Sequence, residues 1–360
     1  MNLDRDSMLY AVSRAAGASE KRMTIPILEN ARIRAHGGAI TVDATDLEIT
    51  WLCRASGDAE LACTVNARRL LDVLKAAPAG EQIKVNQTDS RLGVQFGKSK
   101  FSLATLPIED YPETQSGEVL ETIEITQTDL AEMIAHTLFA VSQEDVRHYL
   151  KGALFVAQGG GLRVVATDGH RLALNEKATL SEADFECIVP RKALLELKRA
   201  LSPTDEVVRI GFGSGLVSFD LGSEVLTSRV IDGRFPDYKK VIPKPSETVM
   251  TINREALRQS INRVAIVAHE KHKAIRMVVS ESVCRLMSAN SSQEEAVDEL
   301  TCEYSGPDIE IAFNLIYILD AVSAVDSERV RIELRNGDSA ALITDDPPTL
   351  ARYIVMPQRV

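Results

Sequence analysis

The 360-residue chain lacks several features that would place it in a restricted class of protein. Its cysteines are few and odd in number, and they form no C-x-x-C pair; they are Cys53, Cys63, Cys187, Cys284 and Cys302. We therefore expect reduced, buried thiols in a cytoplasmic protein. No apolar run approaches the roughly 18 residues that a membrane-spanning helix needs. Residues 1–6 are charged and have no apolar core of the kind that a secretory signal contains.

An excess of positive charge is also missing, because the formal net charge is −11. This balance excludes a protein that is basic over its whole surface, but it still allows DNA binding through one basic face. With 45% hydrophobic and 26% charged residues, the composition is that of a soluble globular protein. The chain is longer than one ordinary hydrophobic core can organise, which predicts two or three domains.

What the chain does contain is a long internal repeat. Residues 164–174, VVATDGHRLAL, predict a strand, a tight polar turn and a second strand. Related stretches occur at residues 42–49 and, more weakly, at 286–291. Aligned on Ala44, Ala166 and Ala289, they are spaced by 122 and 123 residues. Such a period indicates repeated domains, since solenoid units run to about 20–50 residues.

Each copy predicts two amphipathic helices and an antiparallel meander. Residues 3–8, 125–130 and 252–257 predict a strand end and the start of the first helix of each copy, and the second helices follow residues 63–66, 187–190 and 311–314. Asn66 and Asn314 are predicted N-caps, and Pro190 suits a first turn. Alternating runs predict meanders over residues 82–105, 207–230 and 330–355. The predicted fold is α+β with domains at residues 1–120, 121–246 and 247–360.

Several readings of the polar turn stay open on these residues alone. Asp168 and His170 could form an acid–base pair, because residues two apart on a strand face the same side. The turn could also be purely structural, since no nucleophile motif, metal-ligand spacing or phosphate loop accompanies it. The glycine-rich residues 159–161 and 211–215 precede strand-like runs and predict hairpin turns. A sequence-specific DNA regulator would need a recognition helix, and none is visible.

Six motifs in order resemble one known family: residues 24–28 (TIPIL), 148–155 (HYLKGALF), 165–174 (VATDGHRLAL), 229–238 (RVIDGRFPDY), 290–300 (NSSQEEAVDEL) and 353–360 (YIVMPQRV). Together they resemble the bacterial β sliding clamp of DNA polymerase III. The resemblance implies three similar DNA-clamp domains per chain and a head-to-tail dimer ring, with helices inside and antiparallel sheets outside. It implies a non-catalytic, cytoplasmic processivity factor without a cofactor. The alternative is an accessory, plasmid- or phage-type clamp.

The resemblance also implies partners and a site for them. The partners are double-stranded DNA bound without sequence preference, a second copy of the chain, a separate ATP-driven clamp loader, the polymerase III α subunit and other proteins with linear clamp-binding motifs; no membrane is implied. Apolar side chains of a linear motif would enter a cleft between the second and third domains. The matching positions are Leu150, Thr167, Gly169, His170, Arg171, Leu172, Pro236, Lys240, Val241, Asn314, Tyr317, Ile354, Val355, Met356, Pro357, Gln358 and Arg359.

Two further surfaces follow from the resemblance. The DNA contacts would be Arg22, Tyr149, Arg191, Lys192, Lys271 and Lys273. At the dimer interface, apolar Phe101 and Leu103 would meet Ile266 and Val267 of the other chain. Charged residues would surround them, with Lys98 and Lys100 facing Glu294, Glu295, Asp298 and Glu299. The chain departs from the family pattern at His148, Lys240, His272 and Gln358.

Overall fold

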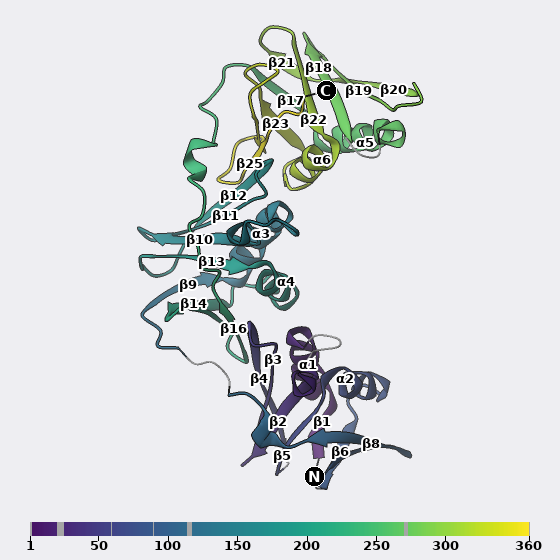
Figure 1. The fold of residues 1–360 in the computed structure, drawn as a ribbon, viewed down its shortest axis with the longest axis vertical. Coiled ribbons are helices and arrows are strands. Elements are labelled where there is room, and N and C mark those ends of the chain that lie inside the picture. Colours follow the sequence, from purple (N-terminus) through teal and green to yellow (C-terminus); the bar gives the residue numbers. More distant parts are fainter. Residues whose placement is uncertain are drawn as a thin grey trace. The chain divides into compact units, whose positions relative to one another are not determined.

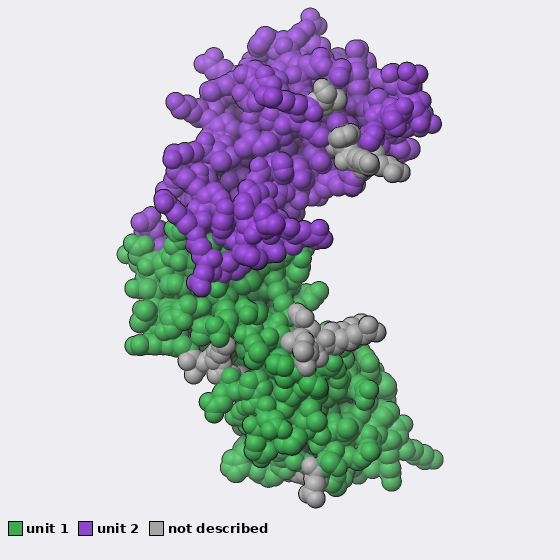
Figure 2. All heavy atoms as spheres, viewed as in Figure 1, with its two compact units in different colours: residues 1–131, 179–230 green, residues 132–178, 231–360 purple. Residues whose placement is uncertain are grey.

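The computed structural model describes residues 2–19, 25–58, 60–88, 90–113, 117–269 and 273–359. The chain divides into two compact units (Figure 2), residues 1–131 with 179–230 and residues 132–178 with 231–360. The central copy of the repeat therefore contributes to both units. The domain boundaries at residues 120 and 246 stay predictions.

The first copy has the predicted order of elements. Its helices are α1 (Arg5–Ala18), α2 (Ala67–Ala76) and the short η1 (Pro26–Glu29) and η2 (Ile108–Asp110). Its strands are β1 (Asn2–Asp4), β2 (Asn30–His36), β3 (Ala39–Thr45), β4 (Ile49–Asp58), β5 (Leu61–Asn66), β6 (Gln82–Thr88), β7 (Arg91–Phe96) and β8 (Ser99–Leu106).

The second copy repeats this order. Its helices are α3 (Gln127–Thr137), α4 (Arg191–Ala200) and the short η3 (Leu138–Ala140), η4 (His148–Leu150) and η5 (Tyr238–Lys240). Its strands are β9 (Glu121–Thr126), β10 (Gly152–Gln158), β11 (Gly161–Thr167), β12 (Arg171–Ala178), β13 (Phe185–Pro190), β14 (Val207–Gly213), β15 (Leu216–Asp220) and β16 (Glu224–Arg229).

The third copy completes the series. Its helices are α5 (Arg254–Val264), α6 (Leu315–Ser323) and the short η6 (Ala265–Val267). Its strands are β17 (Val249–Asn253), β18 (Ala274–Ser280), β19 (Val283–Ala289), β20 (Glu295–Thr301), β21 (Glu303–Ser305), β22 (Ile309–Asn314), β23 (Arg329–Glu333), β24 (Ala341–Asp345) and β25 (Arg352–Val355).

Capping side chains explain where the helices begin. Asn66 accepts a hydrogen bond from the backbone N–H of Arg69, and Asn314 accepts one from Ile316, so both predicted N-caps are confirmed. Pro190 occupies the N-cap of α4 with an extended ψ of 146°, one residue before the first turn in which we expected it. Helix α1 packs against α2 and α5 against α6 (Figure 1).

Antiparallel strands connect neighbouring copies within each unit. One sheet of the first unit has the order β1-β6-β7-β8-β5-β2-β3-β4-β16-β15-β14-β9. In the second unit, a sheet contains the order β10-β11-β12-β25-β24-β23-β17-β21, and a separate sheet has the order β20-β19-β18-β22. The last strand of one copy thus pairs with an inner strand of the copy before it: β16 with β4, and β25 with β12.

Several local predictions are confirmed. The two glycine-rich stretches connect β10 to β11 and β14 to β15 as hairpin turns, with positive φ at Gly159, Gly160 and Gly215. All five cysteines are free and buried, as expected. Burial raises the pKa of the Cys63 thiol to about 11 and that of Cys187 to about 12. Among the described residues, no helix is both long and apolar enough to cross a bilayer.

Candidate functional site

The turn between β11 and β12 is held by its own side chains. The Thr167 hydroxyl accepts a hydrogen bond from Gly169 N–H at 3.1 Å and donates to the Arg171 carbonyl at 2.6 Å. One oxygen of Asp168 accepts from the backbone N–H groups of His170 and Arg171 at 2.9 and 3.0 Å. Its other oxygen lies 3.1 Å from Arg171 Nε. Asp168 is therefore a structural carboxylate, since its oxygens serve the turn itself.

Arg171 joins this turn to helix α6 of the third copy. Its guanidinium lies 2.5 Å from an Asp320 carboxylate oxygen and donates to the Phe139 carbonyl at 2.7 Å. It also lies over the Tyr317 ring at 4.6 Å and the Phe139 ring at 5.2 Å. Burial raises the pKa of the Tyr317 phenol. His170 stacks on Tyr317 with ring centroids 5.9 Å apart, so the turn presents a flat aromatic surface.

The C-terminal strand brings a second part of the chain to this turn. Strand β25 pairs with β12 so that Leu172 lies opposite Ile354 and Arg171 opposite Val355. Beyond the strand, the Met356 N–H donates to the His170 carbonyl at 2.9 Å. Leu150, Leu172, Ile354 and Val355 are buried, whereas Met356 is half-buried. The half-buried methionine thus follows directly on the buried end of strand β25.

The other predicted cleft residues occupy different environments. Asn314 caps α6, Pro357 and Gln358 are half-buried, and Arg359 is exposed. Pro236 and Lys240 are exposed and Val241 is half-buried. The η5 segment is tied to β11 through a 3.2 Å hydrogen bond from Arg163 to the Tyr238 hydroxyl. Lys240 pairs with Asp237 at 3.0 Å.

The predicted DNA contacts divide into described and undescribed positions. Arg22 and Lys271, together with the departing His272, lie outside the described residues. Arg191 begins α4, and its Nε atom is buried without a hydrogen-bond partner among the described residues. Lys192 pairs with Asp46 and donates to the Ala18 carbonyl at 3.4 Å. Tyr149 is half-buried and Lys273 exposed, so these cationic and aromatic groups differ in how freely they face solvent.

The predicted interface residues lie on or directly before two incompletely paired strands and on one short helix. Strand β8 pairs with β7 along its length but with β5 only at Thr105 and Leu106. Strand β20 is at the edge of its sheet. Phe101 stacks on Phe96 at 5.5 Å, while Ile266 of η6 is 82% exposed. Leu103 and Val267 are half-buried, and Lys98 and Lys100 are exposed.

The acidic residues at the predicted interface already have contacts within the chain. Asp298 pairs with Arg263 at 2.6 Å, and Glu299 pairs with Arg285 at 2.7 Å. Glu294 accepts a hydrogen bond from Asn290 at 2.6 Å, and Glu295 is exposed. Contacts of Lys98 or Lys100 with Asp298 or Glu299 would therefore compete with these internal ion pairs.

Comparisons with known proteins decide the family. Residues 1–115, 124–237 and 239–359 match the N-terminal, central and C-terminal domains of the DNA polymerase III beta subunit. The beta sliding clamps of Pseudomonas aeruginosa and Escherichia coli are each 36% identical to this chain over 99% of both chains. The chain belongs to the β sliding clamp family. It is therefore a non-catalytic DNA sliding clamp, and the acid–base interpretation of Asp168 and His170 is wrong.

Solved sliding clamps agree in fold. The P. aeruginosa clamp bound to griselimycin superposes with a TM-score of 0.96 at 36% identity, covering 100% of this chain and 99% of that one. The Bartonella birtlesii clamp bound to griselimycin gives a TM-score of 0.95 at 31% identity, with 100% and 99% covered. The predicted α+β fold of three clamp domains is thereby confirmed.

Sequence reasoning missed several residues that position the clamp's central turn. Arg147 donates to the Asp168 carbonyl at 3.3 Å, and Phe139 and Asp320 hold Arg171. A cluster of Glu132, His136 and Asp326 was also missed. Only the i, i+4 spacing of Glu132 and His136 on one helix face could have drawn attention to it. Asp320 is distant in sequence from its partner Arg171, and Asp326 is distant from its partner His136. No local sequence pattern marks either aspartate.

Proposed function

We propose that the residues around the 167–172 turn and the 354–359 segment form the site at which this clamp binds linear motifs of its partners. The pairing of β25 with β12, extended by the hydrogen bond from Met356 to the His170 carbonyl, is the observation that supports this most directly. It brings buried apolar residues, a half-buried methionine and an aromatic stack to one region of the second unit. Methionine adapts to differently shaped apolar ligands, which suits several partners sharing one site.

The experiment measures binding of a fluorescent linear clamp-binding peptide by anisotropy. The Met356→Ala variant combined with Leu150→Ala should weaken binding by about 2 kcal/mol or more, which is roughly 30-fold, because two apolar contacts are lost. Leu150 is only 1% exposed, so Met356→Ala alone is tested in parallel to separate binding from folding. Met287→Ala, at another half-buried methionine in the same unit, is the matched control. Peptide affinity that matches the control in both variants would refute the assignment.

Griselimycin offers a second ligand with which to test the proposed site. The P. aeruginosa and B. birtlesii clamps have been solved bound to it. We expect this chain to bind it too, and we expect the peptide and griselimycin to compete. Loss of both ligands in Met356→Ala with Leu150→Ala would support one shared site.

For DNA, we propose sequence-independent phosphate contacts through Arg191, Lys192, Lys273 and Tyr149, together with Arg22 and Lys271. Phosphate contacts carry no base information and allow a protein to slide. The exposed Lys273 is consistent with this role. Lys192 would have to exchange its Asp46 partner for a phosphate. These contacts can remain weak because encirclement keeps the clamp on the duplex.

For the dimer, we propose that the free part of the β8 edge meets the β20 edge of a second chain, with Phe101 and Leu103 against Ile266 and Val267. Two unpaired edges with apolar side chains favour strand addition between chains. Lys98 and Lys100 would approach Glu294, Glu295, Asp298 and Glu299. Each rim pair would contribute only about 0–1 kcal/mol, so the apolar anchors must carry the interface.

The dimer is tested by native mass measurement. Ile266→Arg places a charge at the apolar centre of the proposed interface and should convert dimers to monomers at micromolar concentration. Val146→Arg is the control, because Val146 is 88% exposed and lies in the same unit. An unchanged dimer in Ile266→Arg would contradict the proposal.

Two further expectations belong to the proposed function. We propose domain boundaries at residues 1–120, 121–246 and 247–360. We also propose a cytoplasmic location, because replication takes place there in bacteria.

A further inference from the structure

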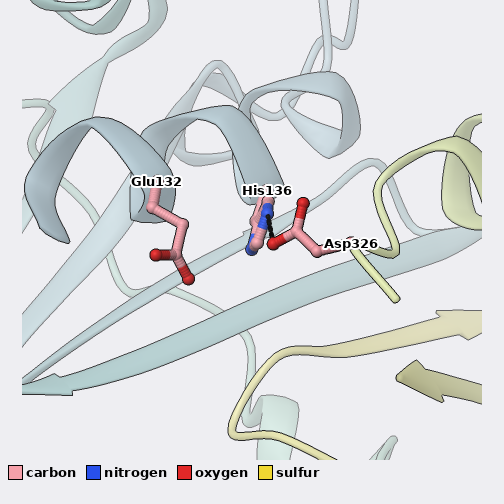
Figure 3. Close-up of side chains that lie close together, drawn as sticks. All are labelled: Glu132, His136 and Asp326. Carbon is pink, nitrogen blue, oxygen red and sulfur yellow. Dashed lines mark ion pairs between the residues drawn. The ribbon is translucent and has the colours of Figure 1, made fainter. Parts of the chain in front are cut away.

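Helix α3 and the loop after α6 bring three potential metal ligands together in the second unit (Figure 3). Glu132 and His136 lie one helical turn apart on α3, and Asp326 approaches from the loop before β23. Their candidate ligand atoms all lie within 4.8 Å of one another, and His136 Nε2 is 3.1 Å from an Asp326 oxygen. Two ligands of one tetrahedral Zn²⁺ are separated by about 3.3–3.5 Å, given Zn–N and Zn–O bonds of about 2.0–2.2 Å.

Neighbouring side chains already fix the orientation of the His136 ring. His136 is 6% exposed, its Nδ1 lies 2.9 Å from the amide nitrogen of Asn175, and Asn175 is 1% exposed. Tyr353 packs edge-on against the ring at 6.2 Å. Partners of this kind orient a histidine that binds a metal. When an ion takes the Nε2 lone pair, the single N–H proton of the neutral ring lies on Nδ1, and Asn175 accepts it through its amide oxygen after a flip.

Comparison with the first copy shows why a cation suits this position. The 122-residue spacing aligns Tyr10 with Glu132 and Arg14 with His136. Arg14 of the first copy supplies a permanent positive charge, 3.0 Å away, to the buried Glu224 on strand β16 of the second copy. In the second copy the arginine is replaced by an imidazole, and two carboxylates face it. The cation there is Lys177, which pairs with Glu132 at 2.8 Å from the side.

We propose that Glu132, His136 and Asp326 bind one transition-metal dication of the Zn²⁺ class. The imidazole favours Zn²⁺, Co²⁺ or Ni²⁺ over Mg²⁺, which prefers oxygen ligands. The Asp326 side chain is 70% exposed, so solvent reaches the site and a water can complete the coordination. The bound ion displaces Lys177 from Glu132 and links α3 of the central copy to the third copy, next to strand β25, which carries Tyr353 and is followed directly by Met356.

The test is a titration of the metal-free full-length protein with Co²⁺, followed by its d–d absorption, and with Zn²⁺ by calorimetry. We expect one ion per chain with a micromolar dissociation constant. His136→Gln and Asp326→Asn should each weaken it at least tenfold, since each removes a ligand. Asp326→Asn changes an exposed side chain, so it keeps the test valid if His136→Gln fails to fold. Lys177→Gln removes the competing ammonium and should tighten binding.

The matched control is His36→Gln. His36 also lies 2.8 Å from a carboxylate oxygen, that of Glu60, but both side chains are exposed, at 92% and 65%. Its substitution should leave the titration unchanged. Co²⁺ binding with equal affinity in wild type, His136→Gln and Asp326→Asn would overturn the proposal. So would an absence of binding below about 100 µM, which would make the cluster an ion pair only.

Discussion

The same turn occurs twice in this clamp, once after β3 and once after β11, with matching hydrogen bonds. The Thr45 hydroxyl accepts from Leu47 N–H and donates to the Ile49 carbonyl, and Asp46 accepts from the N–H groups of Glu48 and Ile49. Thr167 and Asp168 do the same for Gly169, His170 and Arg171. Each turn also accepts one hydrogen bond from the end of the last strand of the following copy. Arg229 N–H donates to the Glu48 carbonyl, and Met356 N–H donates to the His170 carbonyl, both at 2.9 Å.

The side chains on this shared backbone differ at a few positions. Ile49, buried at 1% exposure, corresponds to Arg171, and Glu48 corresponds to His170. On the neighbouring helix, the 124-residue spacing aligns buried Ala193 of α4 with Tyr317 of α6. Asp46 takes its cation from Lys192 of α4, while Asp168 takes its cation from within the turn. The repeat therefore supplies a shared backbone, and three replacements place aromatic and cationic side chains on one copy of it.

The largest expected effect comes from placing an arginine, the residue at position 171 of the second turn, at the corresponding position 49 of the first turn. Ile49→Arg buries a guanidinium where the wild-type side chain is 1% exposed, and Ala193 stands at the position that aligns with Tyr317. An unpaired buried charge should cost about 4 kcal/mol or more in unfolding free energy. Urea denaturation of the purified variant measures it. The conservative Ile49→Val variant should lose only about 1 kcal/mol. Equal stability of the two variants would show that the first turn accommodates a guanidinium at position 49 without a penalty for its burial.

The reverse exchange at the second turn should have a smaller effect. Arg171→Met removes the cation between Asp168 and Asp320 and its contact with Tyr317, so unfolding free energy should fall by about 2 kcal/mol. The peptide-binding assay should also show weaker binding, because the aromatic stack loses its support. Asp320→Asn is the control: its side chain is 36% exposed, and we expect a loss below about 1 kcal/mol that shrinks further in high salt. A larger loss in Asp320→Asn than in Arg171→Met would contradict this account.

Local patterns in the sequence were enough for the elements and for the turn, because these depend on short-range chemistry. Alternation, N-capping asparagines and the Thr-Asp motif each act within a few residues, as the Asn66 and Thr167 hydrogen bonds illustrate. The threefold spacing supplied the domain plan. Contacts across copies could not be predicted this way, since Arg171 and Asp320 are 149 residues apart and nothing near either one specifies the other. The Glu132, His136 and Asp326 cluster escaped for the same reason.

The smallest effect concerns the residue with positive φ in each turn, Leu47 at 78° and Gly169 at 90°. Gly169→Ala adds a Cβ in a conformation that costs an L-residue about 1–2 kcal/mol, and this Cβ would lie 3.0 Å from the Arg147 guanidinium. We expect a loss of about 1 kcal/mol in unfolding free energy. Leu47→Gly relieves the same strain but adds about 0.5–1 kcal/mol of backbone entropy cost, so it should be nearly neutral. Denaturant melts of the two variants measure the difference. If Leu47→Gly proved more destabilising than Gly169→Ala, the leucine side chain would be stabilising the first turn. Positive φ would then not be the shared reason for the residue type at these two positions.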